Sequence, residues 1–261
     1  MRKLIAGTGW KMNIGADATA HYAARVTPLV DGFGDAIEMF VLPPFTSLHA
    51  ARQAFSSSAV GIGGQNVHWD PSGAWTGEVS ASMLVEAGCR YVELGHSERL
   101  EHFGETYDLV RRKVNAAMAA GLTPILCLGE TVEDRQRGLA DKVLEDQMTL
   151  ALADQTAASL SAIILAYEPR WAIGAPAAAS PDYAAERHRN LRSAVGARFG
   201  ADAAAEVRII YGGSVTSGNA AVLMERSEID GLFVGRAAWS ADGFAEIAAI
   251  VAQAANRRKP R

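Results

Sequence analysis

The sequence predicts an α/β fold, a (β/α)8 barrel that forms a single domain over residues 1–261. Short apolar segments alternate with longer amphipathic segments about eight times along the chain, which is typical of this architecture. Most of the apolar segments show no polar face, as expected for parallel strands that are buried on both sides. The alternative is an open, doubly wound sheet, and the absence of a Gly-x-Gly-x-x-Gly motif between a strand and a helix argues against it.

The predicted elements are bounded by ordinary start and stop signals. The eight expected strands are residues 4–6, 38–42, 60–63, 91–94, 125–128, 162–166, 207–211 and 231–234. The clearest helical patterns cover residues 106–120, 134–152, 181–199 and 241–255. Ser180 and Ser240 stand where helix N-caps are expected, while Gly121 and Gly200 suit helix ends. The basic end of the chain, about residues 256–261, is expected to be a solvated tail.

Composition restricts the class of protein. Hydrophobic residues make up 49% of the chain, enough for a large core, and the net charge of −4 argues against a nucleic-acid partner. The N-terminus lacks a signal-peptide core, and no apolar stretch approaches the ~18 residues of a membrane span. Cys89 and Cys127 match no zinc or redox spacing, so we expect two buried thiols and a cytoplasmic protein.

Three chemically active side chains follow three of the predicted strands. Lys11 follows the first strand, His96 the fourth and Glu168 the sixth. In a (β/α)8 barrel the active site lies at the carboxyl ends of the strands, so these groups should share one rim. Glycines cluster after the seventh and eighth strands, where such barrels commonly bind phosphate through backbone N–H groups. The pattern indicates an acid–base enzyme for a small phosphorylated molecule.

Six long motifs identify a family resemblance. They are GTGWKMN, QNVHWDPSGAWTGEVS, YVELGHSERLEHFGET, AYEPRWAIG, IIYGGSV and GLFVGRAAW, in that order along nearly the whole chain. Together they resemble the triosephosphate isomerase family. The resemblance implies a TIM barrel that works as a homodimer and shifts a carbonyl within a phosphorylated sugar, without a cofactor or metal.

The resemblance also implies roles for the three rim residues. Glu168 matches the catalytic base, which moves a proton between two neighbouring carbons. His96 matches the electrophile that polarises the carbonyl, and Lys11 matches the cation that stabilises the enediolate and the phosphate. The structural alternatives are a salt-bridged glutamate, a hydrogen-bonded histidine and a surface lysine.

Further residues match supporting positions of the family. Glu98 is expected to pair with Lys11, and Cys127 matches a position for which a packing role suits the residue as well as a functional one. Thr76 matches the tip of a dimerisation loop, residues 65–78, that reaches into the partner's site.

The same resemblance implies a phosphate site and a lid. Gly174, Ser214 and Gly235 match residues whose backbone N–H groups contact phosphate. The lid sequence departs from the common pattern at two positions. Arg170 replaces a valine, and Pro176 replaces a glycine and is expected to stiffen the loop.

Two departures concern the substrate. Gly9 stands where the family usually has asparagine, and Arg236 where it usually has a second glycine. Both resemble the L-erythrulose-1-phosphate isomerase branch, whose substrate is dihydroxyacetone phosphate with an added hydroxymethyl group. We expect Gly9 to admit the fourth carbon. Arg236 is expected to contact the phosphate or the distal hydroxyl, or alternatively to pair with a carboxylate.

The leading hypothesis is therefore an isomerase that converts L-erythrulose 1-phosphate to D-erythrulose 4-phosphate, in the breakdown of erythritol or another polyol. The alternative from the same family is triosephosphate isomerase, which interconverts dihydroxyacetone phosphate and glyceraldehyde 3-phosphate. A third hypothesis, from another class, is a non-catalytic protein that binds phosphosugars.

Overall fold

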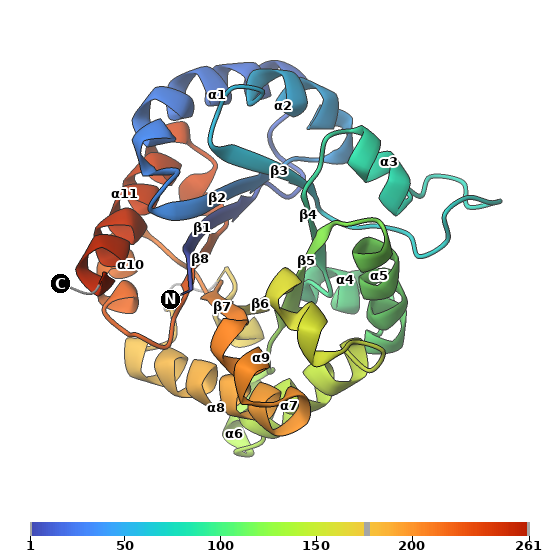
Figure 1. The fold of residues 1–261 in the computed structure, drawn as a ribbon, viewed down its shortest axis with the longest axis vertical. Helices are drawn as coiled ribbons and strands as arrows, with labels where there is room; N and C mark the ends of the chain where they lie inside the picture. The colour runs from blue at the N-terminus through green and yellow to red at the C-terminus, as the bar shows by residue number, and fades with distance from the viewer. Residues whose placement is uncertain (1, 175–177, 260–261) are drawn as a thin grey trace.

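A closed barrel of eight parallel strands, surrounded by helices, forms the molecule, as Figure 1 shows. The structure, a computed structural model, describes residues 2–174 and 178–259. The strands are β1 Leu4–Gly9, β2 Ile37–Leu42, β3 Val60–Gly64, β4 Tyr91–Leu94, β5 Thr123–Leu128, β6 Ile164–Tyr167, β7 Arg208–Tyr211 and β8 Gly231–Val234. They pair in chain order, and β1 pairs with β8 to close the sheet. The predicted fold class is confirmed.

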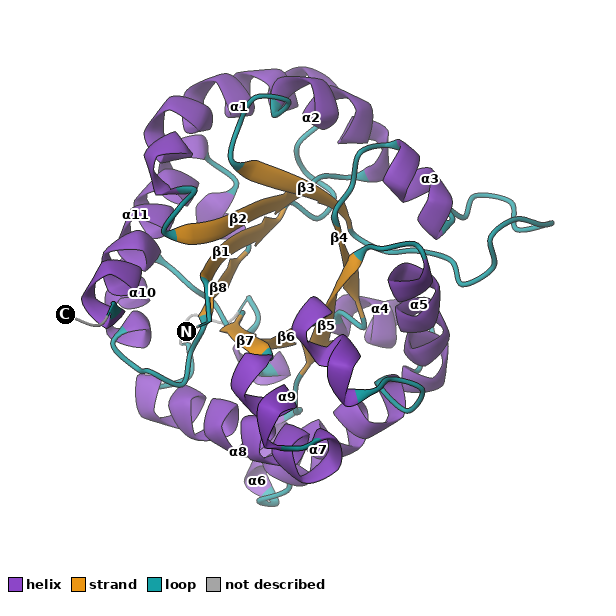
Figure 2. Cartoon of the chain, viewed as in Figure 1, coloured by secondary structure: helices purple, strands orange, loops and turns teal. Residues whose placement is uncertain are grey.

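Helices form the outer layer of the barrel (Figure 2). They are α1 Ala16–Val30, α2 Leu48–Ala54, α3 Ala81–Glu86, α4 Ser97–His102, α5 Tyr107–Ala119, α6 Val132–Gln136, α7 Ala140–Ala151, α8 Pro181–Phe199, α9 Ala201–Glu206, α10 Ser217–Met224 and α11 Ala241–Arg258. Short 3₁₀ helices cover Asp31–Phe33, Phe45–Ser47, Ala157–Ala162, Arg170–Ala172 and Arg236–Ala238. No helix in the described ranges is long and apolar enough to cross a bilayer.

Three predictions of element bounds are clearly wrong, while the other predicted strand and helix ends match or differ by at most two residues. The first strand extends to Gly9 rather than ending at residue 6, because β2 and β8 pair with it on both sides. The single helix expected over residues 134–152 is two helices, α6 and α7, divided at Gly138, whose φ is +71°. The expected tail is also shorter, because α11 runs to Arg258, whose guanidinium donates to three backbone carbonyls of the segment that precedes β8.

Two apolar layers hold the barrel together. The interior is filled by side chains such as Ile5, Phe40, Tyr91 and Phe233, and a larger cluster lies between the sheet and the helices. Because successive strand residues point to opposite faces, every second residue of each strand points into the barrel. The last inward-pointing residue of each strand therefore forms part of the floor of any cavity that opens at the carboxyl ends of the strands.

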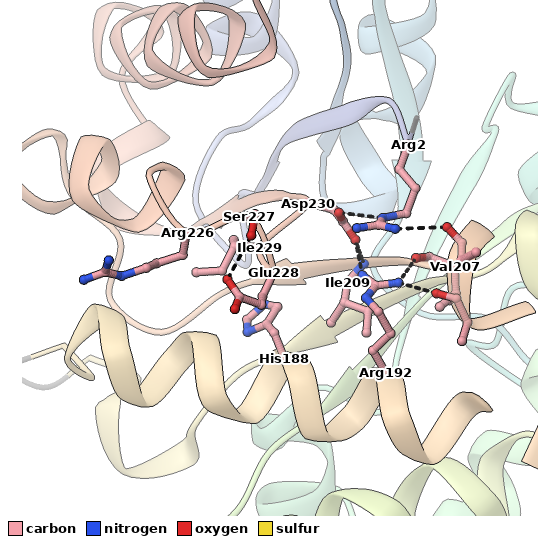
Figure 3. A network of polar contacts seen from close by, with 12 residues as sticks. Arg2, His188, Arg192, Val207, Ile209, Arg226, Ser227, Glu228, Ile229 and Asp230 are labelled. Carbon is pink, nitrogen blue, oxygen red and sulfur yellow. Dashed lines mark hydrogen bonds and ion pairs between the residues drawn. The ribbon is translucent and has the colours of Figure 1, made fainter. Parts of the chain in front are cut away.

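An ionic cluster around Asp230 lies at the amino ends of β1, β7 and β8, at the end of the barrel opposite to the carboxyl ends of the strands (Figure 3). Asp230, which is 1% exposed, accepts hydrogen bonds from Arg2 at 2.7 Å, from Arg192 at 2.5 Å and from the backbone N–H of Ile209 at 2.9 Å. The Asp230 carbonyl also accepts from the N–H of Ile5 at 2.9 Å. Asp230 thus connects β1, β7 and α8 to the start of β8, where the barrel closes.

We predict that Asp230→Asn lowers the free energy of unfolding by about 3 kcal/mol, because it leaves two partly buried arginines without their counter-charge. The control is Asp242→Asn, which removes an exposed ion pair with Arg25, and such pairs contribute about 1 kcal/mol or less. Thermal unfolding of both variants makes the comparison. Equal shifts in the two melting temperatures would contradict a special role for the buried cluster.

Candidate active site

One cavity of about 560 Å³ opens at the carboxyl ends of the strands. Most of the site residues expected from the sequence line this cavity, and they come from both ends of the chain. They are Gly9, Lys11, His96, Glu98, Glu168, Gly174, Ser214, Gly235 and Arg236. Cys127 lies in the barrel interior below them, and Thr76 lies elsewhere. A cavity of this size, with a few convergent polar groups, is typical of a small-molecule site.

Glu168 follows β6 and lies against Gly212 of the next strand's loop. A Cβ atom at position 212 would approach Glu168 Oε1 to 2.5 Å, so only glycine leaves room for this carboxylate. The side chain is buried, and its Oε2 has no hydrogen-bond partner among the described residues. Burial raises the pKa of Glu168 to about 7, while the charge of Lys11 and the Cys127 thiol oppose the shift. The carboxylate is therefore a stronger base than a solvated one.

His96 is held as the N-cap residue of α4. Its Nδ1 accepts a hydrogen bond from the backbone N–H of Glu98 at 3.2 Å. Burial, aided by the charge of Lys11, lowers the pKa of His96 to about 4, so the ring is neutral at pH 7. A neutral ring that accepts at Nδ1 carries its proton on Nε2. That nitrogen lies 3.7 Å from Glu168 Oε2, so this contact joins a proton donor to a base and is not an ion pair.

Lys11 is positioned from both its backbone and its side chain. Its backbone has φ of +51°, and its carbonyl accepts from the Gln65 side-chain amide at 2.9 Å. The same amide donates to the carbonyl of Leu42 at 2.8 Å, which connects Lys11 to β2. Lys11 Nζ lies 2.5 Å from Glu98 Oε1. The sequence singled out Glu98 as the partner of Lys11, but it did not single out Gln65.

The other side of the cavity contains the glycine-rich ends of β7 and β8. Ser214 has φ of +51°, and Gly235 precedes the 3₁₀ helix Arg236–Ala238. Arg236 is exposed at the cavity wall, and its side chain has no ion pair or hydrogen bond within residues 2–174 and 178–259. The carboxylate pairing considered as its alternative role is therefore not observed in this part of the chain.

The lid segment is anchored at its first residues. Trp171 donates from Nε1 to Glu130 Oε1 at 2.8 Å, and Arg170 forms an ion pair with Glu101 of α4 at 2.6 Å. The departure at position 170 thus connects the lid to α4, the helix whose N-cap residue is His96. Pro176, the other departure, lies outside the described residues.

The expected dimerisation loop, residues 65–78, projects away from the barrel between β3 and α3 (Figure 1). His68 is buried at its base and stacks on Trp69 and Trp75, with ring centroids 4.1 and 4.5 Å apart. Thr76 is exposed near the end of the loop and does not line its own chain's cavity.

Sequence reasoning missed Glu93, a buried carboxyl group in the floor of the cavity. The available signal was a glutamate inside the otherwise apolar strand Tyr91–Leu94. Side-chain ligand atoms of Glu93, His96 and Glu168 lie within 4.8 Å of one another, a spacing that a cation could bridge. A cation there would occupy Glu168 Oε2, the oxygen that has no hydrogen-bond partner among the described residues.

Comparisons with known proteins agree with this geometry. A sequence profile of the family "Triosephosphate isomerase" matches residues 3–251. L-erythrulose-1-phosphate isomerase of Mesorhizobium japonicum is 45% identical, over 92% of this chain and 94% of the relative. Triosephosphate isomerase of Symbiobacterium thermophilum is 44% identical, over 98% of this chain and 100% of the relative.

Solved structures give the same result. The crystal structure of triosephosphate isomerase from Bartonella henselae superposes with a TM-score of 0.84 at 34% identity, and the match covers 95% of this chain and 98% of that one. The profile match, the relatives and the shared barrel show that this chain belongs to the triosephosphate isomerase family.

Proposed function

We propose that the protein is an isomerase that converts L-erythrulose 1-phosphate to D-erythrulose 4-phosphate. Membership in the family supports the isomerase chemistry, and the observation that carries the four-carbon substrate is the space at Gly9. A Cβ atom there would meet its nearest neighbours at 3.5 and 3.8 Å, so the missing side chain leaves usable room inside the cavity. Relatives named L-erythrulose-1-phosphate isomerase and relatives named triosephosphate isomerase are nearly equally similar to this chain, so sequence identity alone does not select the substrate.

The reaction moves two hydrogens and leaves the atom count unchanged. Glu168 removes the proton from C3 of the ketose, and His96 Nε2–H donates a hydrogen bond to the carbonyl oxygen on C2. The resulting enediolate is stabilised by the ammonium group of Lys11. A proton then passes from the oxygen on C3 to the oxygen on C2, and Glu168 returns its proton to C2. The carbonyl has moved from C2 to C3.

The phosphate dianion is assigned to the side of the cavity that contains Gly174, Ser214 and Gly235. Backbone N–H groups near a short helix suit an anion, and Arg236 adds a charge with no partner in the described chain. Closing the lid would exclude water from the enediolate, which otherwise loses phosphate.

We further propose a cytoplasmic homodimer that serves the breakdown of erythritol or a related polyol. One observation supports the location and another supports the assembly. Cys89 and Cys127 are both free and buried, as suits a reducing compartment. Loop 65–78 projects from the barrel and carries the exposed side chain of Trp75, as suits a contact with a second subunit. Triosephosphate isomerase activity is the second candidate function, favoured by relatives with that name.

We predict that kcat/KM depends on pH through the ionisation of Glu168. The base acts when deprotonated and its pKa is raised to about 7, so activity should rise with pH through about 7. His96, with a pKa lowered to about 4, stays neutral over this range. The profile is measured after correction for the substrate phosphate, which titrates near about 6. A flat profile between pH 6 and 8 would contradict a base of this pKa.

A substrate panel tests the proposed function itself. We expect wild-type protein to prefer L-erythrulose 1-phosphate over dihydroxyacetone phosphate in kcat/KM. Gly9→Asn should lower the four-carbon reaction about 10- to 100-fold more than the three-carbon one, because the new side chain occupies the open space. Wild-type preference for the triose phosphate would refute the proposal.

The dimer is tested at the loop. Light scattering should give twice the 27.6 kDa chain mass. Thr76→Arg should shift the protein toward monomers and lower kcat by about 100-fold, because a partner loop no longer supports Lys11 and His96. The control is Ser57→Arg, on another exposed loop, which should leave both mass and kcat unchanged. A monomeric wild type with full activity would exclude this role.

A further inference from the structure

Glu93 is a carboxyl group in the cavity floor that the proton transfers leave without a role. Along β4, Tyr91 and Glu93 point into the barrel, while Val92 and Leu94 pack against the helices. The side chain is 7% exposed, and its only hydrogen-bond partner in the described chain is the Cys127 thiol, with Sγ 3.9 Å from Oε1. Burying a carboxyl group with one weak donor costs free energy, so packing alone does not explain it.

The space above Gly9 ends at this carboxyl group. A Cβ atom built at position 9 would lie 3.5 Å from the Phe233 ring and 3.8 Å from Glu93 Oε2. Both are ordinary contact distances, so a small group fits there without displacing either neighbour. The space therefore has an apolar wall on one side and a carboxyl oxygen on the other.

The hydroxymethyl group that the four-carbon substrate adds also has one apolar and one polar portion. L-erythrulose 1-phosphate differs from dihydroxyacetone phosphate by one hydroxymethyl group, which is attached to the carbon that loses its proton. Its methylene suits the Phe233 ring, and its hydroxyl suits Glu93. One side-chain nitrogen or oxygen atom from each of Glu93, His96 and Glu168 lies within 4.8 Å of the other two, so Glu93 lies beside the two groups proposed to transfer protons.

We propose that Glu93 binds the terminal hydroxyl of the four-carbon substrate in the space left by Gly9, and so determines the preference for tetrulose over triose phosphates. This assignment rests on the proposed function. A triose phosphate offers no hydroxyl at that position and leaves the buried carboxyl group with its thiol partner alone. Sites built to bind a hydroxyl discriminate strongly against substrates that lack it.

The charge state of Glu93 is compatible with this role. Burial, followed by repulsion from Glu168, raises the pKa of Glu93 to about 8, although Lys11 opposes the shift. Glu93 is therefore mainly protonated at neutral pH, so it can both donate to and accept from a hydroxyl. It also places little negative charge beside the enediolate.

The test compares wild type, Glu93→Leu and Glu93→Gln on both substrates. The measured quantity is the kcat/KM for L-erythrulose 1-phosphate divided by that for dihydroxyacetone phosphate. Glu93→Leu should lower this ratio about 30-fold, the effect of losing one strong hydrogen bond. Glu93→Gln, which keeps size and hydrogen bonding, should restore the ratio to within about fivefold of wild type. Thermal unfolding confirms that each variant is folded.

A double-mutant cycle adds a second readout. Gly9→Ala fills the space with one methyl group and should also lower the ratio. If Gly9 and Glu93 serve the same hydroxymethyl group, Gly9→Ala combined with Glu93→Leu should lower the ratio no further than the stronger single change. Fully additive losses would overturn the assignment.

The outcomes separate the two proposals. If Glu93→Leu leaves this ratio unchanged, either because kcat/KM falls equally for both substrates or because it does not fall, the role of Glu93 is overturned. A wild-type preference for the tetrulose phosphate would still stand in that case. A wild-type preference for dihydroxyacetone phosphate would instead refute the proposed function, and the inference with it.

Discussion

Closure of the sheet between β1 and β8 is the constraint on which the site depends. Lys11, His96 and Glu168 are far apart in sequence, and no local interaction brings them together. In a closed parallel barrel all eight carboxyl ends lie on one rim, so groups that follow different strands converge there. The Asp230 cluster lies at the other end of the same closure, so the groups that stabilise the barrel are separate from those that line the cavity.

Burial in the cavity shifts the pKa values of Glu168 and His96 in opposite directions. Removing water disfavours the charged form of each, so it raises the pKa of Glu168 and lowers that of His96. A carboxylate becomes a stronger base and an imidazole remains a neutral hydrogen-bond donor in the same cavity. The positive charge of the Lys11 ammonium group opposes this rise in the pKa of Glu168. One physical effect thus accounts for both pKa shifts, and both suit the proton transfers that we propose.

The site residues that could be predicted lie in local sequence motifs, whereas those that were missed depend on contacts between distant strands. Residues within recognisable motifs, such as His96 and Glu168, were found from sequence because strand ends are readable from apolar patterns. Gln65 was not singled out, since its contact with the carbonyl of Lys11 depends on how β3 lies relative to β1. Glu93 was also missed, because its inward direction and the space at Gly9 exist only when two strands face each other across the barrel.

The sequence by itself determined the barrel, the order of its strands, the family and the three groups at the rim. These follow from local patterns: apolar strands, amphipathic helices, capping residues and motifs of several consecutive residues. Only the tertiary structure decided that β1 continues through Gly9, that Arg258 belongs to α11 and that Glu93 adjoins the space at Gly9. Each of those depends on a partner distant in the chain, and pairing across the barrel outweighs local preference.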